Sequence, residues 1–124
     1  MSTWLAVFLG AGIGGALRHG VNLGAARVLG TAFPFGTLIV NVAGCFVMGV
    51  LVESFARFHD PGQTARLFLA TGVLGGFTTF SAFSIDAAIL FERGAPTAAV
   101  LYVAVSVVAS LAGVAAGLLL VRQF

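Results

Sequence analysis

The stretch Gly72–Ser84, GVLGGFTTFSAFS, interrupts an apolar segment of membrane-spanning length near its middle. The whole segment runs from Leu67 to Phe91, and its polar and small residues are concentrated in this stretch. Counted from Arg66, about ten residues at roughly 1.5 Å each reach about 15 Å, which is half of a roughly 30 Å hydrocarbon core. We therefore predict a membrane helix that is broken at the midplane. Four residues that support a helix poorly stand together there: Gly75, Gly76, Thr78 and Thr79.

Two interpretations of this stretch remain open. Lipid cannot satisfy free N–H and C=O groups, so non-helical backbone at this depth must be buried or line a polar cavity, where it is suited to holding an ion. In the second interpretation the helix is continuous, Gly72 and Gly76 form a small-xxx-small contact, and the threonines bond to their own turn. The density of hydroxyl groups, interleaved with phenylalanines, favours the first: Thr78, Thr79, Ser81 and Ser84.

The composition identifies a membrane protein. Of 124 residues, 60% are hydrophobic and 8% charged, and the mean hydropathy is +1.11. A soluble domain carries about 25% charged residues. The net charge of +2 arises without any lysine, so no nucleic-acid surface is expected. A single cysteine, Cys45, excludes an internal disulfide and is interpreted as a small hydrophobe. No catalytic constellation is present at plausible spacing, so we expect no enzyme.

The pattern of apolar runs predicts an all-α membrane protein made of a single domain, residues 1–124. The segment 53–66 is rich in charged residues and contains a Pro-Gly turn, so it is expected to be an aqueous loop. The four predicted spans are residues 4–28, 35–52, 67–91 and 97–121.

Polar side chains inside the spans are few. Thr37 and Asn41 share one face of the second span. A buried amide needs partners for a carbonyl and two N–H donors, so Asn41 either joins two helices or lines a pore. Arg18 lies about 21 Å beyond the first interface, and it either snorkels to the far side or forms part of a cationic mouth. The fourth span carries a polar stripe at four-residue intervals: Tyr102, Ser106 and Ser110.

The distribution of arginines barely distinguishes the two sides of the membrane. One side carries Arg57, Arg66 and Arg122, the other carries Arg27 and Arg93, and Arg18 is ambiguous. So weak a bias does not fix one topology. A protein inserted in both orientations can pair as an antiparallel homodimer, whose twofold axis lies in the membrane plane, and two midplane breaks would then face each other.

Three motifs in this order resemble the CrcB, or Fluc, family of small bacterial fluoride channels. They are GALRHG at 15–20, GTLIVNVAGCFVMG at 36–49 and GVLGGFTTFSAF at 72–83, and the resemblance covers the whole chain. It implies a dual-topology homodimer in the bacterial cytoplasmic (inner) membrane, which exports cytoplasmic fluoride passively through two antiparallel pores. It also implies a structural sodium ion at the dimer centre.

The resemblance further implies specific ligands. By motif position, the backbone carbonyls of Gly75 and Thr78 would hold the sodium ion. Hard donors and the electropositive edges of phenyl rings would replace the water that fluoride sheds. The chain departs from the family pattern at His19, where an aromatic is frequent, and at Asp86, where Glu is common. The implied fluoride pathway comprises Asn41, Phe80, Phe83, Tyr102, Ser106 and Ser110, together with Thr37, Thr79 and, toward a vestibule, Arg18.

Two other classes compete with the channel. A small four-span drug or guanidinium exporter also forms antiparallel dimers, but it needs a buried carboxylate that binds its cation and exchanges protons. The first span carries Arg18 and no acid, and Asp86 is the only intramembrane candidate. A structural subunit would explain the glycines but not the polar stripe. The sequence therefore favours a passive, fluoride-selective conductance.

Overall fold

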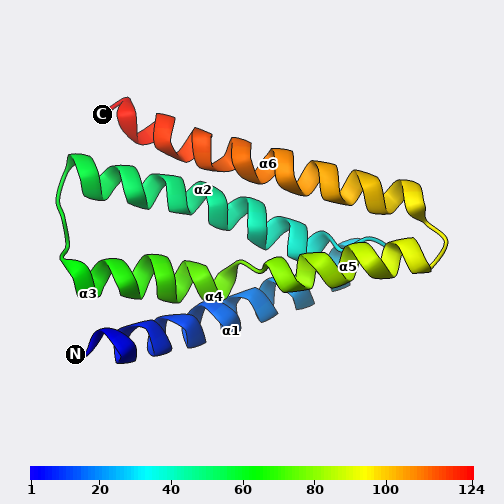
Figure 1. Cartoon of the computed structure of the whole chain (residues 1–124), viewed down its shortest axis with the longest axis horizontal. Coiled ribbons are helices and arrows are strands. Elements are labelled where there is room, and N and C mark those ends of the chain that lie inside the picture. Colours follow the sequence, from blue (N-terminus) through cyan, green and yellow to red (C-terminus); the bar gives the residue numbers. More distant parts are fainter.

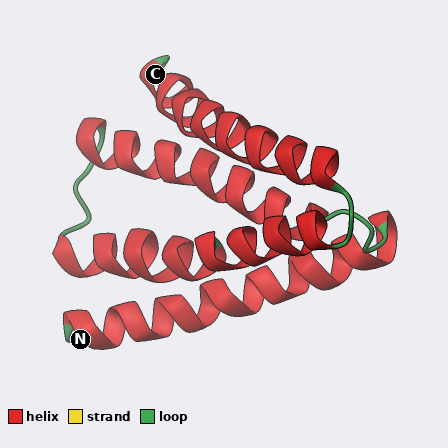
Figure 2. Ribbon diagram, turned by 45° about the vertical axis from the view of Figure 1, so that its right-hand side comes forward, coloured by secondary structure: helices red, strands yellow, loops and turns green.

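The computed structural model describes residues 1–124 and contains helices, short connections and no strand (Figures 1 and 2). Four helical segments are long and apolar enough to cross a membrane, the third being Gln63–Glu92 as a whole. The prediction of an all-α membrane protein is thus confirmed. The elements are α1 (Thr3–Leu29), α2 (Phe35–Arg57), α3 (Gln63–Arg66), the π-helix η1 (Leu67–Leu74), α4 (Gly75–Phe77), α5 (Phe80–Glu92) and α6 (Pro96–Arg122).

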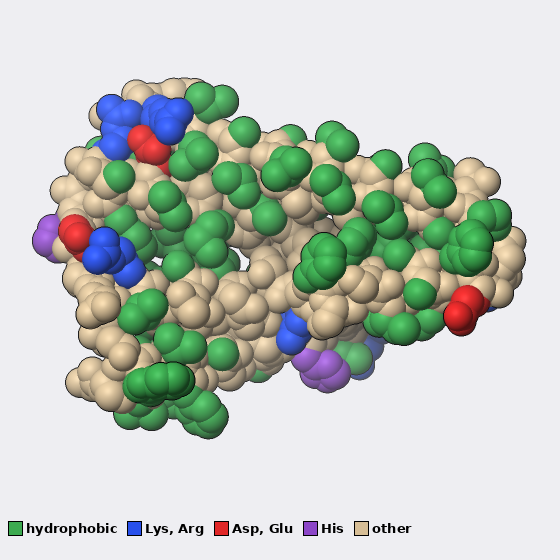
Figure 3. Space-filling model, viewed as in Figure 1, with side chains coloured by type: hydrophobic (Ala, Val, Ile, Leu, Met, Phe, Trp, Pro, Cys, Tyr) green, Lys and Arg blue, Asp and Glu red, His purple; other side chains and the backbone are tan.

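The helices lie roughly along one direction, and both termini are at the same end of the molecule (Figure 1). α2 packs against α6 on one side, while α1 packs along η1 and α4 on the other. Hydrophobic side chains are spread over the face drawn in Figure 3, and most of its charged side chains lie at the two ends. This distribution is that of a protein whose long sides contact lipid.

α1 and the third helix approach each other through glycines. A Cβ atom added at Gly72 would lie 2.9 Å from the Cα of Gly10, and one added at Gly76 would lie 3.0 Å from the Cα of Ala11. Real Cβ atoms do not come so close to backbone. The two helix backbones come this near because the residues at the contact are glycines or alanine.

α2 and α6 meet in the same way, since a Cβ at Gly117 would lie 3.1 Å from the Cα of Gly49. By contrast, Gly20 and Gly24 face open space within the chain. Their four-residue spacing therefore marks no contact between helices of the same molecule.

The third helix is broken, but two residues later than the glycines indicated. Gly75 is helical (φ −62°, ψ −38°) and Gly76 lies in the same short helix α4. The extended residues are Thr78 (φ −86°, ψ 157°) and Thr79 (φ −154°, ψ 122°), midway along Gln63–Glu92. Both earlier interpretations hold in part: the glycines pack helices, and the threonines form the break.

The predicted loop 53–66 is wrong at both ends. α2 continues through Arg57, and the chain becomes helical again at Gln63–Arg66, so the connection is only 58–62. The extra turn of α2 is held by charge, because Glu53 Oε1 lies 3.2 Å from Arg122 Nε and 3.9 Å from Arg57 Nη1. Charged residues thus end the apolar pattern here without ending the helix.

Candidate functional site

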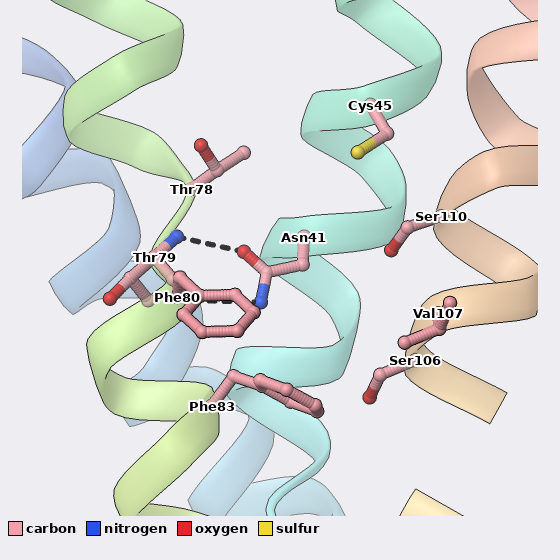
Figure 4. Close-up of a pocket in the computed structure, with 9 residues that line it drawn as sticks. All are labelled: Asn41, Cys45, Thr78, Thr79, Phe80, Phe83, Ser106, Val107 and Ser110. Atoms are coloured by element: carbon pink, nitrogen blue, oxygen red, sulfur yellow. Dashed lines mark hydrogen bonds between the residues drawn. The ribbon is translucent and has the colours of Figure 1, made fainter. Parts of the chain in front are cut away.

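A cavity of about 260 Å³ lies between α2, α6 and the third helix at the level of the break (Figure 4). None of its lining residues carries a charge. The cavity brings together six of the nine predicted pathway residues, from three segments distant in sequence. It is lined by Asn41, Cys45, Thr78, Thr79, Phe80, Phe83, Ser106, Val107 and Ser110.

Asn41 joins α2 to the break with both parts of its amide. Its Oδ1 accepts a hydrogen bond from the backbone N–H of Thr79 (2.8 Å), and its Nδ2 donates to the backbone carbonyl of Thr79 (3.0 Å; Figure 4). The interhelical role considered for this residue is therefore observed. Since an amide has two N–H donors, one N–H of Asn41 is left beside the cavity.

The Asn41 contact frees two backbone carbonyls. In a continuous helix the Thr79 N–H would donate to the carbonyl of Gly75, four residues earlier, but here it donates to Asn41. Likewise the Ala82 N–H donates to Thr79 Oγ1 (3.1 Å) and not to the carbonyl of Thr78. Both carbonyls have thus lost their helical donors at a depth where lipid offers no replacement. Such hard oxygens fit an alkali cation.

Two phenylalanines border the cavity next to the break. The ring centroids of Phe80 and Phe83 are 5.3 Å apart with planes inclined by 50°. Phe83 is buried and also contacts Tyr102, with centroids 5.3 Å apart. Phe80 is 78% exposed in the single chain. One ring is therefore fixed in the core, whereas the other projects from the molecule.

Ser106 carries an unpaired hydroxyl. The residue is only 5% exposed, and its Oγ is a buried polar atom without a hydrogen-bond partner. Burying a hydroxyl without a partner costs free energy, so such groups are rare and require an explanation. Ser106 points from α6 toward the cavity, as Figure 4 shows, with Ser110 one turn further along the helix. The serines of the predicted stripe thus offer free donors to this space.

Thr37 and Tyr102 lie outside this cavity and converge on Asp86. Thr37 Oγ1 donates to Asp86 Oδ2 at 2.7 Å, and Tyr102 Oη donates to the same oxygen at 3.3 Å. Thr37 and Asp86 also line a second cavity of about 350 Å³, near the loop that joins α1 to α2. The sequence marked Asp86 as a departure from the family pattern and as the only intramembrane acid, but it did not indicate that Asp86 joins two predicted pathway residues.

Arg18 and Cys45 also differ from expectation. Arg18 lies on α1 and lines neither cavity, so the single chain does not place it with the other pathway residues. Cys45, interpreted as a small hydrophobe, lines the first cavity. Its position four residues after Asn41, on the same face of α2, was the signal that would have found it.

Comparison with known proteins agrees with the motifs. The family model described as CrcB-like protein, Camphor Resistance (CrcB), matches residues 5–118. The chain is 60% identical to the fluoride-specific ion channel FluC of Methylobacterium nodulans, across 100% of this chain and 99% of that protein. It is 54% identical to the fluoride-specific ion channel FluC of Rhodopseudomonas palustris across 97% of each. This multi-pass membrane protein therefore belongs to the CrcB family.

Proposed function

We propose that the protein is a fluoride channel of the bacterial cytoplasmic membrane, through which cytoplasmic fluoride leaves passively. The observation that carries this proposal is the uncharged cavity at the helix break, with the unpaired Ser106 hydroxyl in its wall. Neutral donors suit conduction, because they compensate for lost water without holding the anion as tightly as a fixed charge would. The names of relatives up to 60% identical also support fluoride as the permeating ion.

Within the cavity, each proposed ligand has a distinct role. The free N–H of Asn41 and the hydroxyls of Ser106 and Ser110 donate to the anion as it sheds water. The positive edges of Phe80 and Phe83 provide weaker contacts from which the ion leaves readily. Thr79 is part of the break that borders the cavity. Thr37 and Tyr102 lie outside the cavity, where both bond to Asp86. Arg18 raises the local concentration of anions at a vestibule.

Efflux from liposomes tests the proposal. Purified protein is reconstituted in vesicles loaded with fluoride, and release is measured with a fluoride-selective electrode at equal pH on both sides. We expect rapid release of fluoride, much slower release of chloride from matched vesicles, and no requirement for a proton gradient. Chloride release at the same rate, or fluoride release only with a proton gradient, would contradict a passive selective channel.

The exporter remains the alternative, and Asp86 is the residue that distinguishes the two. An exporter needs an acid that faces its substrate. Asp86 lies away from the first cavity and accepts hydrogen bonds from Thr37 and Tyr102. Proton-driven guanidinium transport by the same vesicles would favour the exporter, whereas its absence alongside fluoride release favours the channel.

We also propose an antiparallel homodimer embedded in membrane lipid. Phe80 supports it, because a phenyl ring beside a polar helix break is 78% exposed in the single chain and gains cover from a second copy. The nearly balanced arginines support insertion in both orientations. Labelling of the termini in native membranes should find them on both sides, and the mass in detergent should be that of two chains. Termini on one side only would contradict this arrangement.

The carbonyls of Gly75 and Thr78 are the proposed ligands of a structural sodium ion at the centre of this dimer. Their fit rests on the helical donors that both have lost. A bound cation would compensate for the mutual repulsion of carbonyl dipoles brought together from two subunits. Replacing sodium by a bulky organic cation should lower the thermal stability of the dimer as well as the flux. A thermal stability and a fluoride flux that stay the same when sodium is removed would contradict this site.

A further inference from the structure

The only cysteine of the chain stands in the wall of the cavity at the break. Cys45 lies one helical turn after Asn41 on α2, so the two residues share a face. Its Sγ points from α2 toward the space bordered by Thr78, as Figure 4 shows. The thiol is free and the residue is only half-buried. A small reagent that enters the cavity therefore meets this thiol.

A second observation is an unpartnered polar group in the wall of the same cavity. Ser106, on the opposite wall, is 5% exposed, and its hydroxyl is directed toward the cavity without a partner (Figure 4). At roughly 30 Å³ per water, a cavity of about 260 Å³ has room for several water molecules. Cys45 and Ser106 thus border one space, and a group attached to Cys45 would occupy part of it.

We infer that Cys45 is a modification site within the ion pathway, whose thiol takes a soft, thiophilic metal ion such as Hg²⁺, and that the adduct stops the flux. This inference rests on the proposed function. The cysteine S–H bond breaks and its proton passes to the buffer, while an S–Hg bond forms as one chloride leaves mercuric chloride. No oxidation state changes. The bound metal, with its remaining chloride, occupies part of the cavity and narrows the space left for a passing anion.

The test compares wild-type vesicles before and after treatment with mercuric chloride. We expect fluoride efflux to fall at least about tenfold, because the mercury and its chloride obstruct the cavity that the anion must pass. Excess dithiothreitol should restore it. Mass spectrometry of the mercury-treated protein, without dithiothreitol, should find one mercury per chain. The variant Cys45→Ser, compared with itself before and after treatment, should release fluoride at an unchanged rate, and Cys45→Ala serves if the serine variant does not fold.

A matched control moves the thiol out of the cavity. The double variant Cys45→Ser, Val108→Cys carries its cysteine on α6 at a position 67% exposed in the chain, and it should bind mercury without losing flux. Three results would each overturn this inference without overturning the proposed function. They are wild-type flux that persists with mercury bound, wild-type protein that binds no mercury, and equal inhibition of Cys45→Ser. Wild-type vesicles that release no fluoride before treatment would overturn the proposed function, and this inference with it.

Discussion

At the scale of single residues, Asn41 determines what the backbone does at the break. Its side chain pairs with the N–H and the C=O of Thr79, as a neighbouring strand would pair with an extended residue. The N–H and C=O of Thr79, which would form hydrogen bonds within a continuous helix, thereby bond to a side chain of α2. The same contact leaves the Gly75 carbonyl without its helical donor. One side chain thus stabilises the break, borders the cavity and exposes a proposed cation ligand.

Replacing Asn41 tests this role. In Asn41→Ala, the Thr79 N–H and C=O lose their partners, and each unsatisfied buried group costs about 1–3 kcal/mol. We expect a lower midpoint of thermal unfolding in detergent and a loss of fluoride efflux. Ser84→Ala is the control, because the Ser84 hydroxyl bonds only to the Phe80 carbonyl of its own helix (2.9 Å). Unchanged stability in Asn41→Ala would contradict the role assigned to the amide.

Replacing Ser106 should lower the fluoride flux without lowering the stability of the protein. Its buried hydroxyl has no partner, so removing it in Ser106→Ala relieves a penalty of about 1–3 kcal/mol. We expect a melting temperature that is equal or higher, together with fluoride efflux lower by about tenfold, or about 1.4 kcal/mol in the barrier. If efflux stays at the wild-type rate, the hydroxyl is not a ligand of the permeating ion.

At the scale of elements, the third helix shows how far a sequence predicts a broken span. Its length, its apolar character and the existence of a break followed from composition and spacing. Its place near the middle of the span followed as well. Which of Gly75, Gly76, Thr78 and Thr79 leave the helix did not follow, because glycine serves both a kink and a close helix contact, and only the neighbouring helix decides between them. Ala11 of α1 lies against Gly76, which belongs to the helix α4, and the extended residues are Thr78 and Thr79.

The contact between Gly76 and Ala11 predicts that the interface between α1 and the third helix does not tolerate a larger residue at position 76. A methyl group at Gly76 would meet the backbone of Ala11 with a Cβ–Cα distance of 3.0 Å, so α1 and the third helix must separate. We expect Gly76→Ala to destabilise the protein by about 1–3 kcal/mol, measured as thermal unfolding in detergent. Gly12→Ala on the open face of α1 has nothing within 4 Å and should be neutral or stabilising. Equal losses in both variants would argue against packing as the cause.

At the scale of the whole molecule, the candidate site was partly predictable. Helical spacing placed Ser106 and Ser110 on one face, and the family motifs indicated Asn41, Phe80 and Phe83. Contacts between helices were not predictable: the convergence of Thr37 and Tyr102 on Asp86 joins residues 16 to 49 positions apart. The spacing of residues along one helix predicts which side chains share a face, but not which other helix that face contacts. The rotation of each helix about its axis, which turns the face shared by Asn41 and Cys45 toward the cavity, is set by packing.

A passive, fluoride-selective pathway predicts a specific reversal potential in a planar bilayer. A tenfold fluoride gradient is imposed across the reconstituted protein, with chloride and pH equal on both sides. If fluoride alone permeates, the current must reverse at a magnitude of about 59 mV, the value for a tenfold ratio of a monovalent ion. A reversal potential near zero, or the absence of any current while fluoride still moves with protons, would contradict the account.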